Sequence, residues 1–372
     1  MFVDFNFLIF NAQKYIFFYK ISFFCFFALK LLFKNTMINT ENVQQQQVAK
    51  YKLLEKYCKL IGSKQINGID ATIIETKNKH KSVSVSALFT EHIDFDLSYF
   101  PLKHLGYKVM VASIMDIFAV NGTPKTVRID IALSNRFSEN AIDELMNGIM
   151  LCCSKYKVKI TGLDFKSSAT GLIIATSTTG GVAQDKIVCR NGAKENELIC
   201  VTGDLGSAYA GLILLEREKK VFEADPTQQP DFIGVDYLLE RYLKPEPPAE
   251  ILNTLSQHNI LPTSMLNLNN GLASGLIQLC NASKLGCSVF EDKLPVEILT
   301  FDKLKELNIV ATTIALNGGE DYELLFTIKQ DDYEKVKDLK EISVIGYMTS
   351  ESSGRNIITN DNRQFELKAQ GY

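Results

Sequence analysis

The chain has 372 residues, 46% of them hydrophobic, and a formal net charge of −3 at pH 7. This length is sufficient for two domains with separate cores, and the balanced charge gives no reason to expect nucleic acid as a partner. The eight cysteines include no C-x-x-C pair and have no histidine nearby at zinc-site spacing. The cysteine pattern therefore indicates scattered reduced thiols in a cytoplasmic protein.

Residues 1–36 form an apolar extension that holds 11 of the 23 phenylalanines. A membrane anchor is one interpretation, because residues 15–33 approach the length that spans a bilayer. A signal peptide fits less well, because no small-residue cleavage site follows the apolar stretch. The third interpretation is a misplaced translation start. Phe, Lys, Asn and Ile are the residues that A/T-rich DNA encodes, and Met37 begins a sequence of ordinary composition. We expect membrane contact only if the extension is real.

Strands and helices are expected to share the N-terminal domain, residues 45–181. Strict alternation predicts strands, and leucine and lysine spacing predicts helices. Ser138 followed by Glu139 is typical of a helix start. The predicted strands are 70–75, 82–89, 127–134, 158–161 and 172–177, and the predicted helices are 50–62, 107–121 and 138–156.

Residues 182–372 are expected to form a C-terminal domain. The stretch LICVTG predicts a strand from residue 198, and SAYAGLILLEREKK predicts a helix over 207–220. Residues 225–248 read as a proline-bearing connector, a further helix is expected near 331–340, and short strands close the chain. Mixed elements in two halves predict an α/β (α+β) fold with two domains. The sequence contains no P-loop and no G-x-G-x-x-G motif, so the common nucleotide-binding folds are unsupported.

Asparagines gather in the stretch PTSMLNLNNGLASGL, residues 262–276. Asn270 and Gly271 favour a turn, because both residue types tolerate positive φ. Together with Asn267 and Asn269, this junction of a loop and a helix suits polar ligands. With aspartate at positions 267 and 270, the same loop would hold a divalent metal ion.

Four stretches carry a family resemblance: 94–125, 189–212, 262–276 and 317–327, the last reading NGGEDYELLFT. In order and spacing they resemble the thiamine-phosphate kinase family, a branch of the superfamily of aminoimidazole-ribonucleotide synthetase, over about residues 45–372. The resemblance implies a two-domain aminoimidazole-ribonucleotide synthetase-like fold and a homodimer whose N-terminal strands form a shared barrel. It also implies Mg²⁺-dependent transfer of the γ-phosphoryl group of ATP to thiamine monophosphate, giving thiamine diphosphate.

The resemblance implies roles for individual residues as well. Magnesium takes hard oxygen ligands, which the family supplies as aspartates from several separate loops. The implied metal ligands are Asp70, Asp116, Asp164, Asn267 and Asn270. The implied nucleotide contacts are Arg190 and Asn269, and the implied substrate contacts are Glu320, Tyr372 and Asp94.

Ordinary structural roles are the alternatives for these residues. Asp116 suits a helix surface or cap, and Asp164 suits a tight turn. Glu320 suits a solvated loop before a strand, and Arg190 suits the exposed surface that most arginines occupy.

Several acidic positions of the family pattern are lost in this chain. Asn267 and Asn270 replace aspartates, and Ala87 replaces an aspartate that binds metal. Asp94 replaces a histidine that faces the substrate. Ile69 and Gly275 fill two further acidic positions. Two Mg²⁺ ions beside an ATP with about four negative charges need anions around them.

Two hypotheses follow from these losses. The first is a phosphotransferase of the thiamine-phosphate kinase type, in which Asp116 and Asp164 hold one remaining magnesium. The second is a catalytically inactive pseudoenzyme that binds a nucleotide or a protein partner.

Overall fold

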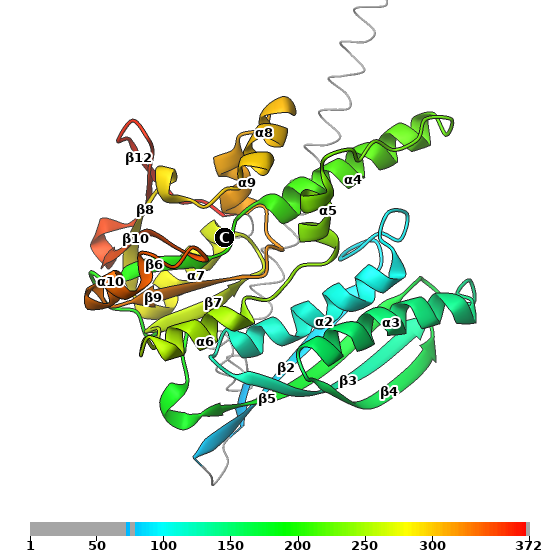
Figure 1. Ribbon diagram of the computed structural model, residues 1–372, viewed down its shortest axis with the longest axis horizontal. Coiled ribbons are helices and arrows are strands. Elements are labelled where there is room, and N and C mark those ends of the chain that lie inside the picture. The colour runs from blue at the N-terminus through cyan, green and yellow to red at the C-terminus, as the bar shows by residue number, and fades with distance from the viewer. Residues whose placement is uncertain (1–71, 75–78, 370–372) are drawn as a thin grey trace, which may run out of the picture. The chain divides into compact units, whose positions relative to one another are not determined.

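The computed structural model describes residues 72–74 and 79–369, whose strands form two β-sheets (Figure 1). The extension at 1–36 and the helix predicted over 50–62 lie outside the described residues. In the described part of the chain, no helix combines the length and the hydropathy needed to cross a bilayer. The mixture of helices and sheets confirms the predicted α/β (α+β) class.

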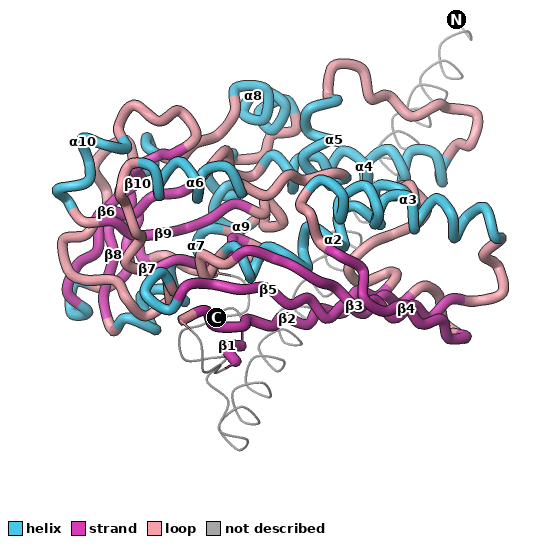
Figure 2. The backbone as a smooth tube through the Cα atoms, turned by 60° about the horizontal axis from the view of Figure 1, so that its bottom comes forward, coloured by secondary structure: helices cyan, strands magenta, loops and turns pink. Residues whose placement is uncertain are grey.

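The first sheet has the strand order β1-β2-β5-β3-β4, and helices α2 and α3 cover one of its faces (Figures 1 and 2). Strands β3 and β4 are parallel, and the other neighbours are antiparallel. Val83 and Val85 of β2 pack against Ile117 of α2, as the alternation of this strand predicts. The bounds are β1 Thr72–Ile74, β2 His80–Thr90, α2 Leu102–Phe118, β3 Thr123–Leu133, α3 Glu139–Lys155, β4 Lys159–Ser167 and β5 Ile173–Ala183.

Strand β4 runs well past its predicted end at residue 161. The strand pairs with β3 alone at the edge of the sheet, and apolar Leu163 and Phe165 stand at its exposed positions, so hydrophobicity does not follow burial along it. Main-chain pairing keeps it extended, with Asp164 opposite Asp130. The interpretation of Asp164 as a turn residue is therefore wrong.

Two glycines allow α2 and α3 to cross closely. A Cβ added at Gly148 would lie 1.8 Å from the carbonyl oxygen of Lys103, and one added at Gly106 would lie 2.1 Å from that of Leu145. We expect Gly148→Ala to push the helices apart and to lower the free energy of unfolding by about 2–3 kcal/mol. Urea denaturation measures this loss, and Met150→Ala, at a half-exposed position of the same helix, is the control. Equal stability of the two variants would contradict the account.

The second sheet has the strand order β12-β11-β8-β10-β6-β9-β7 and belongs to the C-terminal half of the chain. Strand β9 is buried at every position, so it reads as a continuous run rather than an alternation. The strand bounds are β6 Leu198–Thr202, β7 Ser264–Leu268, β8 Leu285–Phe290, β9 Glu323–Ile328, β10 Ile342–Ser350, β11 Arg355–Ile358 and β12 Gln364–Glu366. The helix bounds are α4 Ser207–Ala224, α5 Asp236–Leu243, α6 Ala249–Gln257, α7 Leu272–Ser283, α8 Ile298–Glu306, α9 Ala311–Asn317 and α10 Tyr333–Val336.

The predicted connector over 225–248 contains helix α5, and α6 follows it directly. Leu238 and Tyr242 bury one face of α5, and Leu255 is buried in α6. Both helices are short, so packing against the rest of the fold stabilises them more than helix propensity does. For that reason the sequence pattern did not reveal them.

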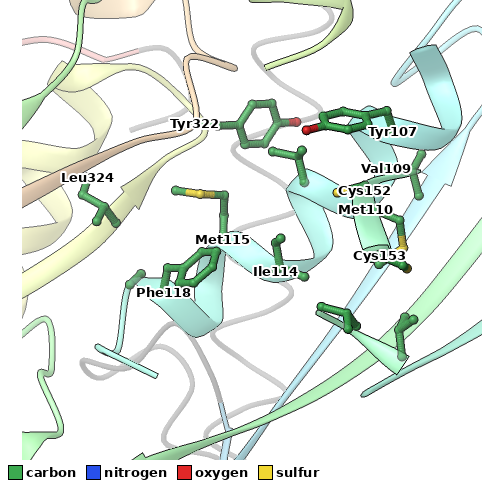
Figure 3. Packing of buried hydrophobic residues seen from close by; sticks show 14 of the residues in the cluster. Tyr107, Val109, Met110, Ile114, Met115, Phe118, Cys152, Cys153, Tyr322 and Leu324 are labelled. Carbon is green, nitrogen blue, oxygen red and sulfur yellow. The ribbon is translucent and has the colours of Figure 1, made fainter. Parts of the chain in front are cut away.

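An apolar cluster joins the two halves of the chain. It contains Ile114 of α2 together with Met265 of β7 and Leu324 of β9. Figure 3 shows Tyr322, just before β9, with its hydroxyl end toward Tyr107 of α2. The core is therefore shared between the halves, and the division between residues 181 and 182 stays a prediction.

Candidate active site

One stripe of helix α2 carries polar side chains into the shared core. Lys108, Ala112 and Asp116 lie four residues apart, so they point to the same side of the helix. One position from this stripe, the Ser113 hydroxyl lies 2.7 Å from that of Thr176 in β5, which fixes the helix on the sheet. The stripe therefore has a defined orientation, with a cation at one end and an acid at the other.

Asp116 meets Asn267 of strand β7. The Asn267 Nδ2 atom donates to Asp116 Oδ1 over 3.1 Å, while Asn267 Oδ1 is buried and has no hydrogen-bond partner. Burial raises the pKa of Asp116 to about 6, and the hydrogen bond from Asn267 opposes this shift. A buried carbonyl oxygen without a donor, close to a carboxylate, has the chemistry of an incomplete cation site.

The loop after β7 is tied to the loop before β9. The backbone nitrogen of Glu320 donates to the carbonyl oxygen of Asn269 over 2.8 Å. Gly271 and Gly319 both have positive φ. A Cβ at Gly319 would lie 2.7 Å from the carbonyl oxygen of Asn269, and one at Gly271 would lie 2.7 Å from that of Leu316 at the end of α9. The side chains of Asn269 and Asn270 are exposed beside this contact. The two glycines thus allow the asparagine loop and the GGED loop to pack directly against each other.

Lys108 and Glu320 form an ion pair at the other end of the α2 stripe. The Lys108 Nζ atom lies 2.9 Å from Glu320 Oε2 and 3.6 Å from the ring centroid of Tyr242. The lysine side chain is 6% exposed, whereas that of Glu320 is 32% exposed. Burial lowers the pKa of Lys108, and the charge of Glu320 opposes that shift. Glu320 has a φ of 59°, which is uncommon outside glycine.

Tyr322 is influenced by acids from both ends of the stripe. Burial raises its pKa, and the negative charges of Glu320, Asp94 and Asp116 raise it further. Asp94 itself is exposed and accepts a hydrogen bond of 2.7 Å from the backbone nitrogen of Thr90. The carboxylates of the predicted substrate and metal positions therefore act on the same phenol.

A buried charge cluster supports the GGED loop from behind. Arg241 of α5 lies 3.1 Å from Asp204 and 3.0 Å from Glu323. Asp321 is fully buried and accepts a hydrogen bond from the backbone nitrogen of Gly206 over 3.0 Å. Burial raises the pKa of Asp321 to about 8 and that of Glu323 to about 7, against the lowering effect of Arg241. Three carboxylates thus share one guanidinium.

The remaining predicted residues are more scattered. Asp164 lies on edge strand β4, where it forms an ion pair of 3.3 Å with Lys166 and accepts from its neighbour's backbone nitrogen. Arg190 is half-buried, and its carbonyl oxygen accepts from Ser283. Asp70 and Tyr372 lie outside the described residues. The structure thus joins Asp116 to Asn267 at one end of the α2 stripe, and Glu320 to Lys108 and Asn269 at the other.

Sequence reasoning missed Lys108, Tyr242 and Tyr322. Lys108 stands in the apolar run GYKVMVAS, where a lone charge was the available signal. Tyr242 lies in helix α5, within the segment 225–248 that the sequence predicted to be a connector. In the described part of the chain, no group of three or more His, Cys, Asp and Glu side chains forms a metal site.

Comparison with known proteins gives the class of this fold and site. Residues 68–182 match the model for AIR synthase related protein, N-terminal domain. The structure of AaThiL complexed with AMPPCP and TMP superimposes with a TM-score of 0.74 at 22% identity, covering 86% of this chain and 95% of that one. The chain therefore has the AIR synthase-like fold.

Curated relatives identify the family within this class. The thiamine-monophosphate kinase of Bacillus subtilis (strain 168) is 28% identical over 311 residues, which cover 82% of this chain and 91% of the relative. That of Pyrococcus abyssi (strain GE5 / Orsay) is 30% identical over 242 residues, 65% of this chain and 70% of the relative. The chain belongs to the thiamine-monophosphate kinase family.

Proposed function

We propose that this chain transfers the γ-phosphoryl group of ATP to thiamine monophosphate. Two contacts on one stripe of α2, Asn267 with Asp116 and Glu320 with Lys108, carry this proposal. The family membership supports it, and so does the solved AaThiL complex, which holds AMPPCP and TMP. Phosphoryl transfer is mostly positioning and charge neutralisation, and these polar side chains suit both tasks.

A divalent cation fits the Asp116 and Asn267 pair. The orphaned Asn267 Oδ1 and the Asp116 carboxylate offer two oxygen ligands, with Asn270 as a further candidate from the exposed loop. Bound Mg²⁺ would neutralise phosphate charge. Asp116 supplies the carboxylate of this pair, whereas Asn267 contributes a neutral carbonyl oxygen. We expect weaker metal binding than at a site of several aspartates.

The other predicted residues keep their proposed roles. Asn269 and Arg190 would contact the nucleotide, and Glu320 and Asp94 would contact the substrate. Asp70 and Asp164 are proposed as further metal ligands and Tyr372 as an aromatic contact to the substrate.

A pseudoenzyme is the second candidate, and one observation favours it. The hydrogen bond from Asn267 to Asp116 satisfies one oxygen of the carboxylate without a metal ion. A chain that kept the fold and lost the cation could still bind a nucleotide or a protein partner.

Calorimetric titration separates binding from its absence. We expect the purified full-length chain to bind ATP in the presence of Mg²⁺, and Asp116→Asn to weaken that binding by about tenfold or more. The exposed Asp331→Asn is the matched control. An ATP affinity that changes neither with Mg²⁺ nor with the Asp116→Asn substitution would exclude the proposed metal site.

We also propose a homodimer built on the first sheet. The face of this sheet away from α2 and α3 carries the 64% exposed Leu88 and the hydroxyls of Ser84 and Ser86. We expect light scattering to give twice the protomer mass of 41.7 kDa, and Leu88→Glu to shift the chain toward the monomer. A wild-type chain that is monomeric at micromolar concentration would refute this.

A further inference from the structure

Lys108 fixes the position of the Glu320 carboxylate. Its ammonium group lies between the carboxylate, at 2.9 Å, and the ring of Tyr242, at 3.6 Å, so it cannot move without losing a hydrogen bond and a cation–π contact. Phe100 adds a second ring at 5.3 Å. Lys108 is buried, and Glu320 is the acidic partner of its ion pair.

Glu320 is held from two other directions. Its backbone nitrogen bonds to Asn269, and its positive φ is fixed by the adjoining Gly319 turn. Such a φ costs about 1 kcal/mol or more, so the surrounding contacts must maintain it. The carboxylate is nevertheless about one-third exposed. A carboxylate that is held in place and remains accessible suits an organic cation or an N–H donor.

The two ends of the α2 stripe differ in what they can bind. Lys108 and Asp116 are eight residues apart, which places them about 12 Å apart along the helix axis. The Asp116 end can hold a cation and thereby a phosphate, whereas the Glu320 end offers a partly exposed carboxylate, backed by Lys108 and the buried ring of Tyr242. Thiamine monophosphate carries a cationic ring system at one end and a phosphate at the other.

We propose that Lys108 is a positioning residue, which presents the Glu320 carboxylate to the cationic ring part of the substrate while the phosphate points toward Asp116. This inference rests on the proposed function, because it takes thiamine monophosphate as the substrate. It assigns Lys108 no contact with the reacting atoms. Recognition of the ring part then requires the ion pair and does not require the metal.

Unphosphorylated thiamine is the probe that separates this inference from catalysis. We expect Lys108→Met and Glu320→Gln each to weaken thiamine binding, measured by calorimetry, by about tenfold or more. The double variant should bind thiamine no more weakly than either single variant, because each change alone already removes the Lys108–Glu320 ion pair. Affinity for Mg²⁺–ATP should stay within about twofold, and Lys108→Arg should restore part of the thiamine affinity.

Lys103→Met, at an exposed position of the same helix, is the matched control. Methionine fits the buried lysine stem, so we expect Lys108→Met to fold, and thermal unfolding checks this. Unchanged thiamine affinity in a folded Lys108→Met variant would overturn the inference, as would additive effects in the double variant. If wild-type chain binds thiamine through this pair yet forms no diphosphate, the proposed function fails and the inference stands.

Discussion

Ala87→Asp combined with Asn267→Asp and Asn270→Asp is expected to raise the affinity for Mg²⁺–ATP by at least about tenfold, or about 1.4 kcal/mol. The structure places position 87 opposite Thr176, whose hydroxyl meets Ser113 one turn before Asp116. The restored carboxylates would therefore enter the region of the orphaned Asn267 oxygen. Added charge beside Asp116 strengthens divalent-metal binding, because Mg²⁺ prefers charged oxygen ligands.

The same triple variant should lose stability when metal is removed. The carboxylate introduced by Asn267→Asp would face Asp116 across the present 3.1 Å hydrogen bond, and two like charges at that distance repel each other. We expect the melting temperature to fall in chelator and to recover with Mg²⁺, as ligand linkage requires. A triple variant that binds Mg²⁺–ATP no better than the wild type would show that the asparagine loop is not an eroded metal site.

Arg241→Met is expected to lower the free energy of unfolding by about 3–5 kcal/mol, because it leaves three carboxylates in the core without their cation. Arg241 contacts Asp204 and Glu323 directly, and its charge also acts on Asp321. The raised pKa values of Asp321, about 8, and Glu323, about 7, set the sign of the pH dependence. Stability from such groups is present at low pH and is lost as pH rises through these values.

Arg241 stabilises the ionised forms of Asp321 and Glu323, so it limits the loss of stability as pH rises. We therefore expect Arg241→Met to lower the free energy of unfolding more at pH 8 than at pH 5.5. Denaturant unfolding at both pH values measures the difference. Arg363→Met is the control, because this arginine is 71% exposed in a surface ion pair, and its loss should cost less than about 0.5 kcal/mol. A similar small loss for Arg241→Met at both pH values would contradict the role of the cluster.

Local pattern predicted the regular elements where one face of each element is buried. The alternation of β2 and the spacing and serine start of α3 identified these elements almost to their ends. Helix α5 and the outer part of β4 were missed, since packing and pairing with distant segments hold them in place. Contacts of this kind do not produce a regular spacing of hydrophobic residues in the sequence.

Site residues were predictable only where the family pattern marked them. Asp116, Asn267 and Glu320 were named, although they come from an N-terminal helix, a central strand and a loop before β9. Lys108 was not, because its partner lies 212 positions further along the chain. The asparagines at positions 267 and 270 were visible in the sequence, whereas the orphaned side-chain oxygen of Asn267 required coordinates.

Conversion of thiamine monophosphate to thiamine diphosphate tests the central claim most directly. The purified full-length chain would be incubated with ATP, Mg²⁺ and thiamine monophosphate, and both nucleotide and thiamine products would be followed by phosphorus NMR. We expect equal amounts of ADP and thiamine diphosphate, and we expect Asp116→Asn to form neither. Binding of both substrates without any diphosphate formed would contradict it and would identify the chain as a pseudoenzyme.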